Sequence, residues 1–185
     1  MIERTIKEFD GHLNTGLVGI PVMMEWAAKA NQPDFIYSML KKKTYPGYLY
    51  MLEQGATATW EHWAGDRSRI HNCFNGVGQW FYQAIGGICS LPGKQAYSEF
   101  LVDPQIPEGV TWAKTTQETP YGKIGVHWEL HNETITMEVE VPVGSIAKLI
   151  SPESAISTRI NQEVITDQSD TISLKSGKYF VEYSF

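Results

Sequence analysis

The sequence predicts a two-part fold: an all-α N-terminal half followed by an all-β antiparallel sandwich. Three observations predict it. Apolar residues recur at helical spacing up to about residue 92, and they alternate with period two from about residue 93 onward. The change falls at Leu91-Pro92-Gly93, a turn-forming sequence. We therefore expect two domains, residues 1–92 and 93–185.

Four helical segments are expected in the N-terminal half: residues 15–30, 32–43, 45–55 and 75–91. The first has Leu17, Ile20, Met24 and Ala28 along one side. The second has Pro33 in its first turn and lysines at its end, where they complement the helix dipole. Several of these helices are apolar on more than one face, so four of them do not close a bundle alone and belong in a larger helical layer.

Six runs in the second half alternate as β-strands do: residues 109–118, 122–132, 134–143, 145–151, 171–177 and 178–185. The clearest is 134–143. Its apolar face is formed by Ile135, Met137, Val139 and Val141, and its polar face by Thr134, Thr136, Glu138 and Glu140. Turn signals separate the runs, as in a sandwich or barrel.

Composition excludes several classes of protein. A formal charge of −6 argues against nucleic acid as the main partner, and Lys41 to Lys43 are interpreted as a solvated helix end. The N-terminus lacks the apolar core of a signal peptide, and no run reaches the roughly 18 residues that span a membrane. Cys73 and Cys89 have no zinc or redox spacing, so we expect plain thiols, with no metal and no cofactor.

Most histidines have a structural interpretation. His127 and His131 fit the alternation of a strand, and His12 precedes the first expected helix as a cap or surface residue. The loop "GATATWEHWAGDRSRIHNCFNG" is different, because acidic, basic and histidine side chains stand among tryptophans there. Glu61 could activate water as a general base. Equally, Glu61 or Asp66 could pair with Arg67 beside packed aromatics.

Several motifs resemble the late part of the catalytic domain of bacterial α-L-rhamnosidases, glycoside hydrolase family 78. They read "HLNTG", "TYPGYLYMLEQGATATWEHW" and "SRIHNCFNGVGQWFYQAIGGI". The run "GVTWAKTTQETPYGKIGVHWEL" is similar to the family's C-terminal β-sandwich, so the resemblance covers roughly residues 10 to 151.

The resemblance implies a fold, a reaction and a site. The N-terminal half would be the C-terminal helices of an incomplete (α/α)6 barrel, and the reaction would be hydrolysis of terminal α-L-rhamnosyl linkages with inversion. Inversion uses two carboxyl groups roughly 6.5–9.5 Å apart, an acid and a base. The motifs place the general base on Glu61 and the substrate-binding positions on His71, Trp60, Trp63 and Tyr48.

The sequence departs from the family in ways that affect function. His62 occupies a variable position, and Asn72 replaces a common aromatic. The family's general acid lies upstream of these motifs, and residues 1–14 do not carry it. The replacement candidates, Glu25, Glu53 and Asp66, lie outside the acid motif. We therefore expect a fragment with a base and no acid, and negligible activity in isolation.

The expected partner is a rhamnose-containing glycan or glycoside, with no nucleic acid and no membrane span. Exposed barrel helices would also favour self-association. The alternative function is a non-catalytic carbohydrate-binding or interaction module that uses Trp112, Tyr121 and Trp128, residues that core packing would equally explain. A truncated chain without a function of its own is a third possibility.

Overall fold

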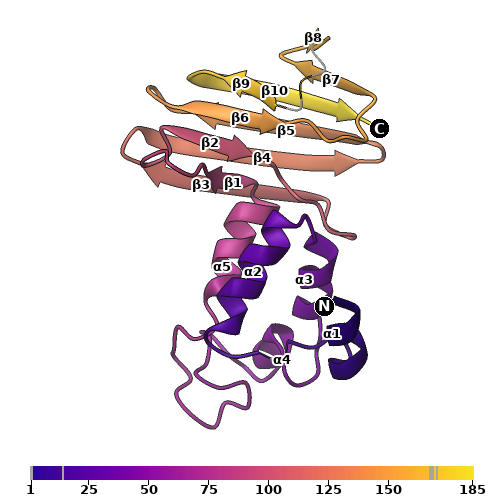
Figure 1. The fold of residues 1–185 in the computed structure, drawn as a ribbon, viewed down its shortest axis with the longest axis vertical. Coiled ribbons are helices and arrows are strands. Elements are labelled where there is room, and N and C mark those ends of the chain that lie inside the picture. Colours follow the sequence, from indigo (N-terminus) through magenta and orange to yellow (C-terminus); the bar gives the residue numbers. More distant parts are fainter. Residues whose placement is uncertain (1, 14, 167–168, 170) are drawn as a thin grey trace. The chain divides into compact units, whose positions relative to one another are not determined.

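The computed structural model describes residues 2–13, 15–166, 169 and 171–185. Its chain forms two compact units, Met1–Phe81 and Tyr82–Phe185, which are described separately (Figure 1). We call them the helical unit and the β unit. Within the described residues, the longest helix has 11 residues, and none is long and apolar enough to cross a bilayer.

The helical unit contains five helices joined by long irregular segments. They are α1 (Ile2–Phe9), α2 (Gly19–Lys29), α3 (Pro33–Leu40), α4 (Tyr48–Glu53) and α5 (Gly76–Trp80), and a π-helical turn, η1 (Phe81–Ile85), follows directly. Pro33 lies in the first turn of α3, as predicted. Helix α1 was not predicted from the sequence, and it carries an i,i+4 ion pair between Arg4 and Glu8 at 2.9 Å.

The prediction of an all-α N-terminal half made of the last helices of an (α/α)6 barrel is wrong. The helices are only 5 to 11 residues long, and residues 54–75, all described, form neither helix nor strand. Strand β1 (Ile88–Ser90) lies inside the expected fourth helix. The helical turn ends at Ile85, and the chain changes direction at Gly87, where φ is +69° and a Cβ atom would lie 2.4 Å from the Pro104 nitrogen.

Close packing around α2 organises the helical unit. Ile20, Met24 and Ala27 of α2 are buried. Gly76 at the start of α5 is so close that a Cβ there would lie 3.1 Å from Ile20 Cγ2. His12 is buried rather than a cap or surface residue, and its Nε2 is 2.7 Å from Thr44 Oγ1. Both cysteines are free, Cys73 buried and Cys89 partly buried, which confirms the expected plain thiols.

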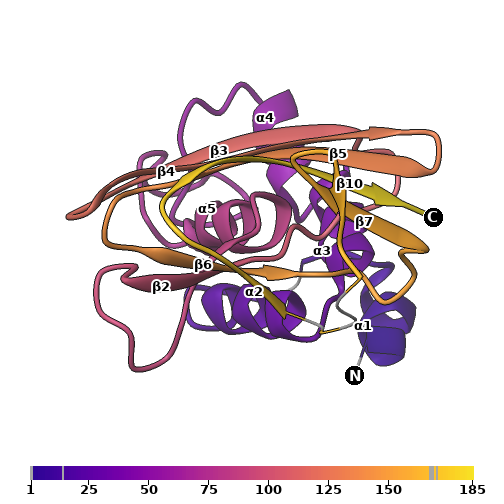
Figure 2. The ribbon, with the colours of Figure 1, turned by 90° about the horizontal axis from the view of Figure 1, so that it is seen from above.

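The β unit consists of two sheets packed face to face (Figure 2). One has the order β1-β2-β6-β9 and the other β3-β4-β5-β10-β7-β8. After β1, the strands are β2 (Glu99–Val102), β3 (Trp112–Thr119), β4 (Gly122–His131), β5 (Thr134–Val141), β6 (Ile146–Ile150), β7 (Ser157–Ile160), β8 (Glu163–Val164), β9 (Thr171–Leu174) and β10 (Gly177–Ser184). Strands β2 and β6 run parallel, a departure from the expected antiparallel pattern.

Alternation fixes which side chains of the β unit enter the core. The four apolar residues predicted for one face of β5 are all buried, which confirms that prediction. Trp128 of β4 is fully buried, and its Nε1–H donates to the Ile85 carbonyl oxygen at 2.8 Å. The Tyr183 hydroxyl donates to the Ile150 carbonyl oxygen at 3.2 Å and so links the two sheets.

Candidate functional site

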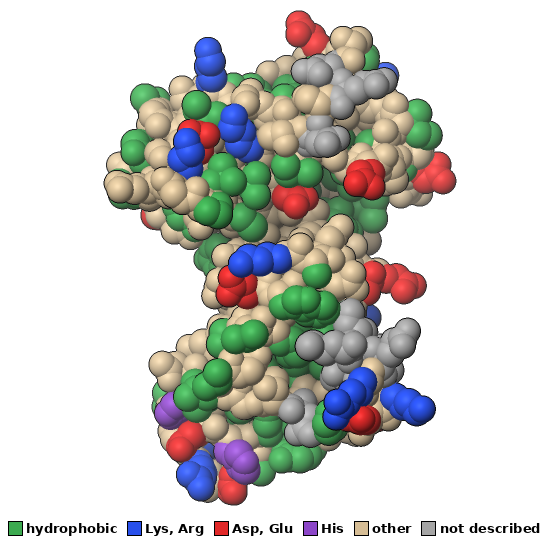
Figure 3. All heavy atoms as spheres, in the orientation of Figure 1, with side chains coloured by type: hydrophobic (Ala, Val, Ile, Leu, Met, Phe, Trp, Pro, Cys, Tyr) green, Lys and Arg blue, Asp and Glu red, His purple; other side chains and the backbone are tan. Residues whose placement is uncertain are grey.

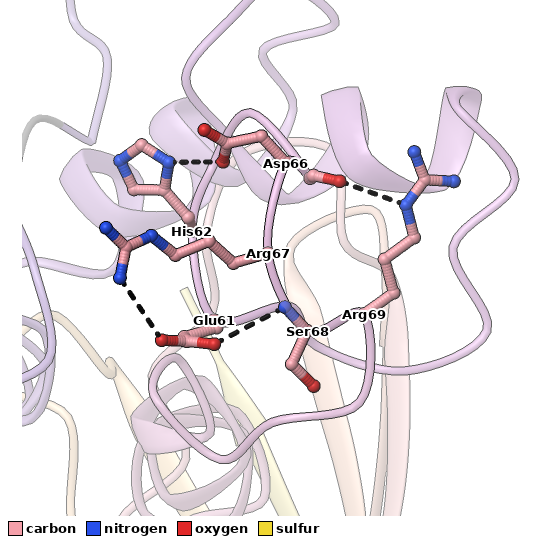
Figure 4. A network of polar contacts seen from close by, with 7 residues as sticks. Glu61, His62, Asp66, Arg67, Ser68 and Arg69 are labelled. Carbon is pink, nitrogen blue, oxygen red and sulfur yellow. Dashed lines mark hydrogen bonds and ion pairs between the residues drawn. The ribbon is translucent and has the colours of Figure 1, made fainter.

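The predicted site residues lie mainly on the loop between α4 and α5, residues 54–75. Two backbone hydrogen bonds draw the sides of this loop together. The His71 amide donates to the Thr59 carbonyl, and the Glu61 amide donates to the Ser68 carbonyl, each at 2.8 Å. Residues 62–67 therefore form a closed lobe with Glu61 at its base (Figure 4).

The Glu61 carboxylate is held at the base of this lobe. Its Oε2 accepts the Ser68 backbone N–H at 3.3 Å, and its Oε1 lies 3.7 Å from Arg67 Nη1 (Figure 4). The Glu61 side chain is 34% exposed and that of Arg67 is 67% exposed, so water reaches both. The ion pair considered from the sequence is therefore present, and it leaves the carboxylate accessible.

A second polar pair caps the lobe. His62 Nδ1 and Asp66 Oδ1 are 2.7 Å apart, and this hydrogen bond lowers the pKa of Asp66. Arg69 Nε donates to the Gly65 carbonyl oxygen at 3.1 Å. Figure 3 shows histidine, basic and acidic side chains gathered at one end of the helical unit. The loop thus presents a charged surface to solvent.

Each of the three candidate replacement acids contacts a basic or histidine side chain. Asp66 is hydrogen-bonded to His62, which lowers its pKa and keeps it ionised. Glu25 pairs with Lys29 at 2.6 Å, and Glu53 pairs with Lys43 at 3.1 Å. A general acid must hold its proton at working pH, and the lowered pKa of Asp66 does not favour that role.

Trp63 and Tyr48 form an aromatic framework under the loop. Trp63 is 6% exposed, stacks on Phe74 with ring centroids 3.8 Å apart, and meets Tyr48 edge-on at 5.3 Å. The Tyr48 hydroxyl donates to the Phe74 carbonyl oxygen at 2.5 Å, and burial raises the pKa of Tyr48. These rings fix the loop, and their role as substrate contacts stays a prediction.

Trp60 supports the lobe from inside. It is 2% exposed, and the Arg69 guanidinium lies 5.1 Å from the centre of its ring. Gly65, in the same lobe, has a φ of +67°. A Cβ atom built on Gly65 would lie 2.6 Å from Trp60 Cζ3. Only glycine combines this backbone angle with such a close approach.

His71 has a defined hydrogen-bonding state. The Cys73 backbone N–H donates to His71 Nδ1 at 3.1 Å, so a neutral imidazole carries its proton on Nε2. The Thr59 hydroxyl lies 2.5 Å from the His71 carbonyl oxygen, which ties the residue to the opposite side of the loop. The ring is partly exposed and can offer Nε2–H to a ligand hydroxyl.

An apolar hollow of about 490 Å³ lies elsewhere in the helical unit, lined by residues of α3, α4 and the 56–59 segment together with Val77 and Phe81. Tyr48 and Thr59 line it, but Glu61, His71, Trp60 and Trp63 do not. Within the described residues, no group of three or more His, Cys, Asp or Glu could hold a metal ion.

Comparison with known proteins decides the family. The model of the bacterial α-L-rhamnosidase six-hairpin glycosidase domain matches residues 1–85, and that of the bacterial α-L-rhamnosidase C-terminal domain matches residues 87–165. The chain belongs to the bacterial α-L-rhamnosidase family. This confirms the family that the sequence motifs predicted.

Individual relatives agree. An α-L-rhamnosidase of Formosa agariphila is 31% identical over an alignment of 185 positions that covers 94% of this chain and 20% of the relative. The solved α-L-rhamnosidase of Dictyoglumus thermophilum superposes with a TM-score of 0.89 at 25% identity, covering 100% of this chain and 22% of that one. The Streptomyces avermitilis α-L-rhamnosidase, solved with L-rhamnose, shares the fold (TM-score 0.85, 22% identity, 97% and 19% covered).

The chain therefore spans about a fifth of the length of the rhamnosidases that it matches, and it corresponds to a C-terminal part of such proteins. Sequence reasoning placed Glu61 and His71 in one loop but missed the residues that hold them. Ser68 and Thr59 act through a backbone amide, a backbone carbonyl and a hydroxyl. Spacing gives no signal for such contacts.

Proposed function

We propose that this chain supplies the base side of an inverting α-L-rhamnoside hydrolase. The observation that carries the proposal is the partly exposed Glu61 carboxylate at the base of the lobe, in a chain of this family. Each of its oxygens has one protein contact, which leaves lone pairs for a water molecule. In inverting hydrolysis such a carboxylate deprotonates the attacking water.

His71 completes the proposed sugar contact. Its Nε2–H can donate to a sugar hydroxyl, because Nδ1 is already occupied by the Cys73 amide. The S. avermitilis relative was solved with L-rhamnose, and we propose a rhamnose-containing glycan or glycoside as the substrate here. Thr59 joins the two groups, since it is bonded to His71 and lies two residues before Glu61.

The proposed reaction also needs an acid, and we propose that this chain has none. Glu25 and Glu53 are in exposed ion pairs, and Asp66 has a lowered pKa. Without protonation, an alkoxide leaves poorly, so turnover of a natural rhamnoside by this chain should be negligible. An aryl rhamnoside with an acidic phenol needs less acid assistance and should retain slow hydrolysis.

The test is hydrolysis of 4-nitrophenyl α-L-rhamnoside by the 185-residue chain and by Glu61→Gln. Loss of a general base should lower the rate by about 10²-fold or more. Asp66→Asn is the matched control and should retain the rate. The first product, followed by NMR, should be β-L-rhamnose. Retained configuration, or a rate that survives Glu61→Gln, would contradict the proposal.

Binding provides an independent readout. Titration with L-rhamnose should shift the NMR signals of the His71 ring and the Ser68 amide, because both lie beside the proposed water site. If neither signal moves and the aryl rhamnoside is not cleaved, the loop is not a sugar site.

We also propose that the chain self-associates through the apolar surface around α2. Leu17, Val18 and Val22 are 54%, 76% and 63% exposed, and Figure 3 shows separate hydrophobic patches over the helical unit. Exposed apolar side chains that cluster, as these three do within residues 17–22, mark association surfaces. Light scattering should show oligomers whose population rises with concentration, and Val22→Glu should reduce it. A monodisperse monomer at high concentration would contradict this proposal.

A further inference from the structure

The outer face of the six-stranded sheet carries ordered rows of polar side chains. Cross-strand pairing defines two rows: Lys114, His127, Glu138 and Phe180, and beside it Thr116, Gly125, Glu140 and Lys178. Their neighbours along each strand point into the core, since successive strand residues face opposite sides. These eight residues therefore share one solvent-facing surface.

Gly125 creates a groove in this surface. A hollow of about 530 Å³ extends across β3, β4, β5 and β10 with Gly125 among its lining residues. A Cβ atom built on Gly125 would lie 3.4 Å from Glu140 Cβ, an ordinary contact, and no left-handed φ requires glycine here. The backbone therefore does not require glycine at position 125, and the absence of a side chain leaves an open space in the row.

The groove offers both hydrogen-bond donors and acceptors. Glu140 lies 3.3 Å from Lys123 Nζ and 3.5 Å from Lys178 Nζ, and its hydrogen bond with Lys123 lowers its pKa, so it stays ionised. Glu138 Oε2 is 3.9 Å from His127 Nδ1. All of these side chains are at least partly exposed, so their remaining donors and acceptors face the solvent.

A second hollow of about 500 Å³ adjoins the first along β3 and β4, and Trp112, Glu129 and His131 line it. Glu129 lies 2.9 Å from His131 Nε2 and 3.3 Å from His127 Nε2, so His127 connects the two hollows. Trp112 is 63% exposed, and Phe180 in the first hollow is 44% exposed. Tyr179, which is partly exposed, also lines the first hollow, so each hollow has at least one accessible aromatic ring.

Charge and shape together indicate the ligand. Three lysines (Lys114, Lys123, Lys178) and three carboxylates (Glu129, Glu138, Glu140) line the two hollows, so their formal charges cancel. A balanced surface does not favour phosphate or a uronate chain. Sugar hydroxyls both donate and accept, which suits mixed ammonium and carboxylate groups. Aromatic rings pack against the apolar face of a pyranose ring.

We propose that this face is a binding site for a neutral oligosaccharide that crosses β3, β4, β5 and β10, with Phe180 and Trp112 against sugar residues that are not adjacent in the oligosaccharide. The site is separate from Glu61 and does not depend on the proposed hydrolysis. It also revises the carbohydrate-binding alternative considered from the sequence. Trp128 is fully buried and cannot contact a ligand, whereas the polar rows beside Trp112 were not recognised.

The test is an NMR titration of the 185-residue chain with cellohexaose, xylohexaose and mannohexaose, and with hexagalacturonate for comparison. At least one neutral hexamer should saturably shift the backbone amides of β4 and β10, with hexagalacturonate at least about tenfold weaker. Tighter binding of hexagalacturonate, or no shift with any neutral hexamer, would overturn the proposal.

Two variants locate the site. Trp112→Ala removes a ring, and Gly125→Thr fills the groove with a side chain that favours strands. Each should weaken binding by about tenfold or more. Because Gly125→Thr should fold at least as well as the original chain, lost binding there cannot be attributed to unfolding. Unchanged binding in both variants would overturn the assignment.

Two controls complete the experiment. Tyr121 is 40% exposed but lies outside both hollows, at the turn between β3 and β4, so Tyr121→Ala should bind as the original chain does. Glu61→Gln should also bind normally. If Glu61→Gln alone abolished binding, the ligand would occupy the loop of the helical unit and the sheet would not be the site.

Discussion

The two units position their polar surface residues by different kinds of contact. In the helical unit, the Glu61 carboxylate is placed by single contacts from an irregular loop, one amide and one guanidinium, and the same loop depends on one glycine packed on Trp60. In the β unit, the outer rows are placed by a ladder whose register repeats along every strand pair. A repeated contact tolerates the loss of one member, whereas a single contact does not. Surface changes should therefore be mild in the β unit and costly in the loop.

The largest expected effect separates core from surface within the β unit. Trp128→Ala removes a fully buried indole and leaves the Ile85 carbonyl without its donor. We expect a loss of about 3–5 kcal/mol of stability. Trp112→Ala, at a 63% exposed position, should change stability by no more than about 0.5 kcal/mol. Urea unfolding followed by circular dichroism measures both, and similar losses would show that the outer face is not a tolerant surface.

The next effect tests whether the loop depends on one glycine. Gly65→Ala must adopt φ of +67° and place its methyl group against Trp60, which together should cost about 2–4 kcal/mol. Gly55 has φ of +82° but no atom within 4 Å of a Cβ, so Gly55→Ala should cost only about 1 kcal/mol. Thermal unfolding compares the two. Equal losses would mean that backbone strain alone, and not the contact with Trp60, shapes the lobe.

The smallest effect contrasts two aspartates. The hydrogen bond to His62 lowers the pKa of Asp66 below 3.8, whereas burial raises the pKa of Asp103 above 3.8. The Asp66 contact therefore stabilises the folded state above the unfolded pKa and is lost as pH falls through the folded value. Asp103 has the opposite sign, because its contribution is lost as pH rises through its folded pKa.

Carbon-detected NMR titration of the carboxyl groups checks both directions. His62→Ala should move the Asp66 midpoint upward and leave that of Asp103 unchanged. Midpoints that coincide in the original chain would contradict the contrast between an exposed, hydrogen-bonded carboxylate and a buried one.

Sequence patterns predicted the β unit better than the helical unit for a physical reason. Alternation in residues 134–141 specifies both the strand and its buried face, because a slip of one residue would expose every apolar side chain. The run at 75–91 is apolar throughout, and such runs do not distinguish helix from strand. In this run the helical turn ends at Ile85. Gly87 then packs closely against Pro104, a contact that the local sequence pattern does not indicate.

The site was also predicted only in part from the sequence. Motif and spacing brought Glu61, His62, Asp66, Arg67 and His71 into one loop, and the structure brings them together there. The pairing of Glu61 with Ser68, and of His71 with Cys73, uses backbone amides that every residue possesses. Residue identity carries no record of these contacts, so only the folded loop reveals them.

The glycine behind Trp60 has a consequence for chirality. An L-residue at position 65 meets both a strained backbone angle and the indole ring. A D-residue favours positive φ and directs its β-carbon away from the position that an L-residue would use. Chemical synthesis with D-alanine at position 65 would therefore stiffen the loop where an ordinary alanine scan would break it, and handedness rather than side-chain size would decide whether the lobe packs on Trp60.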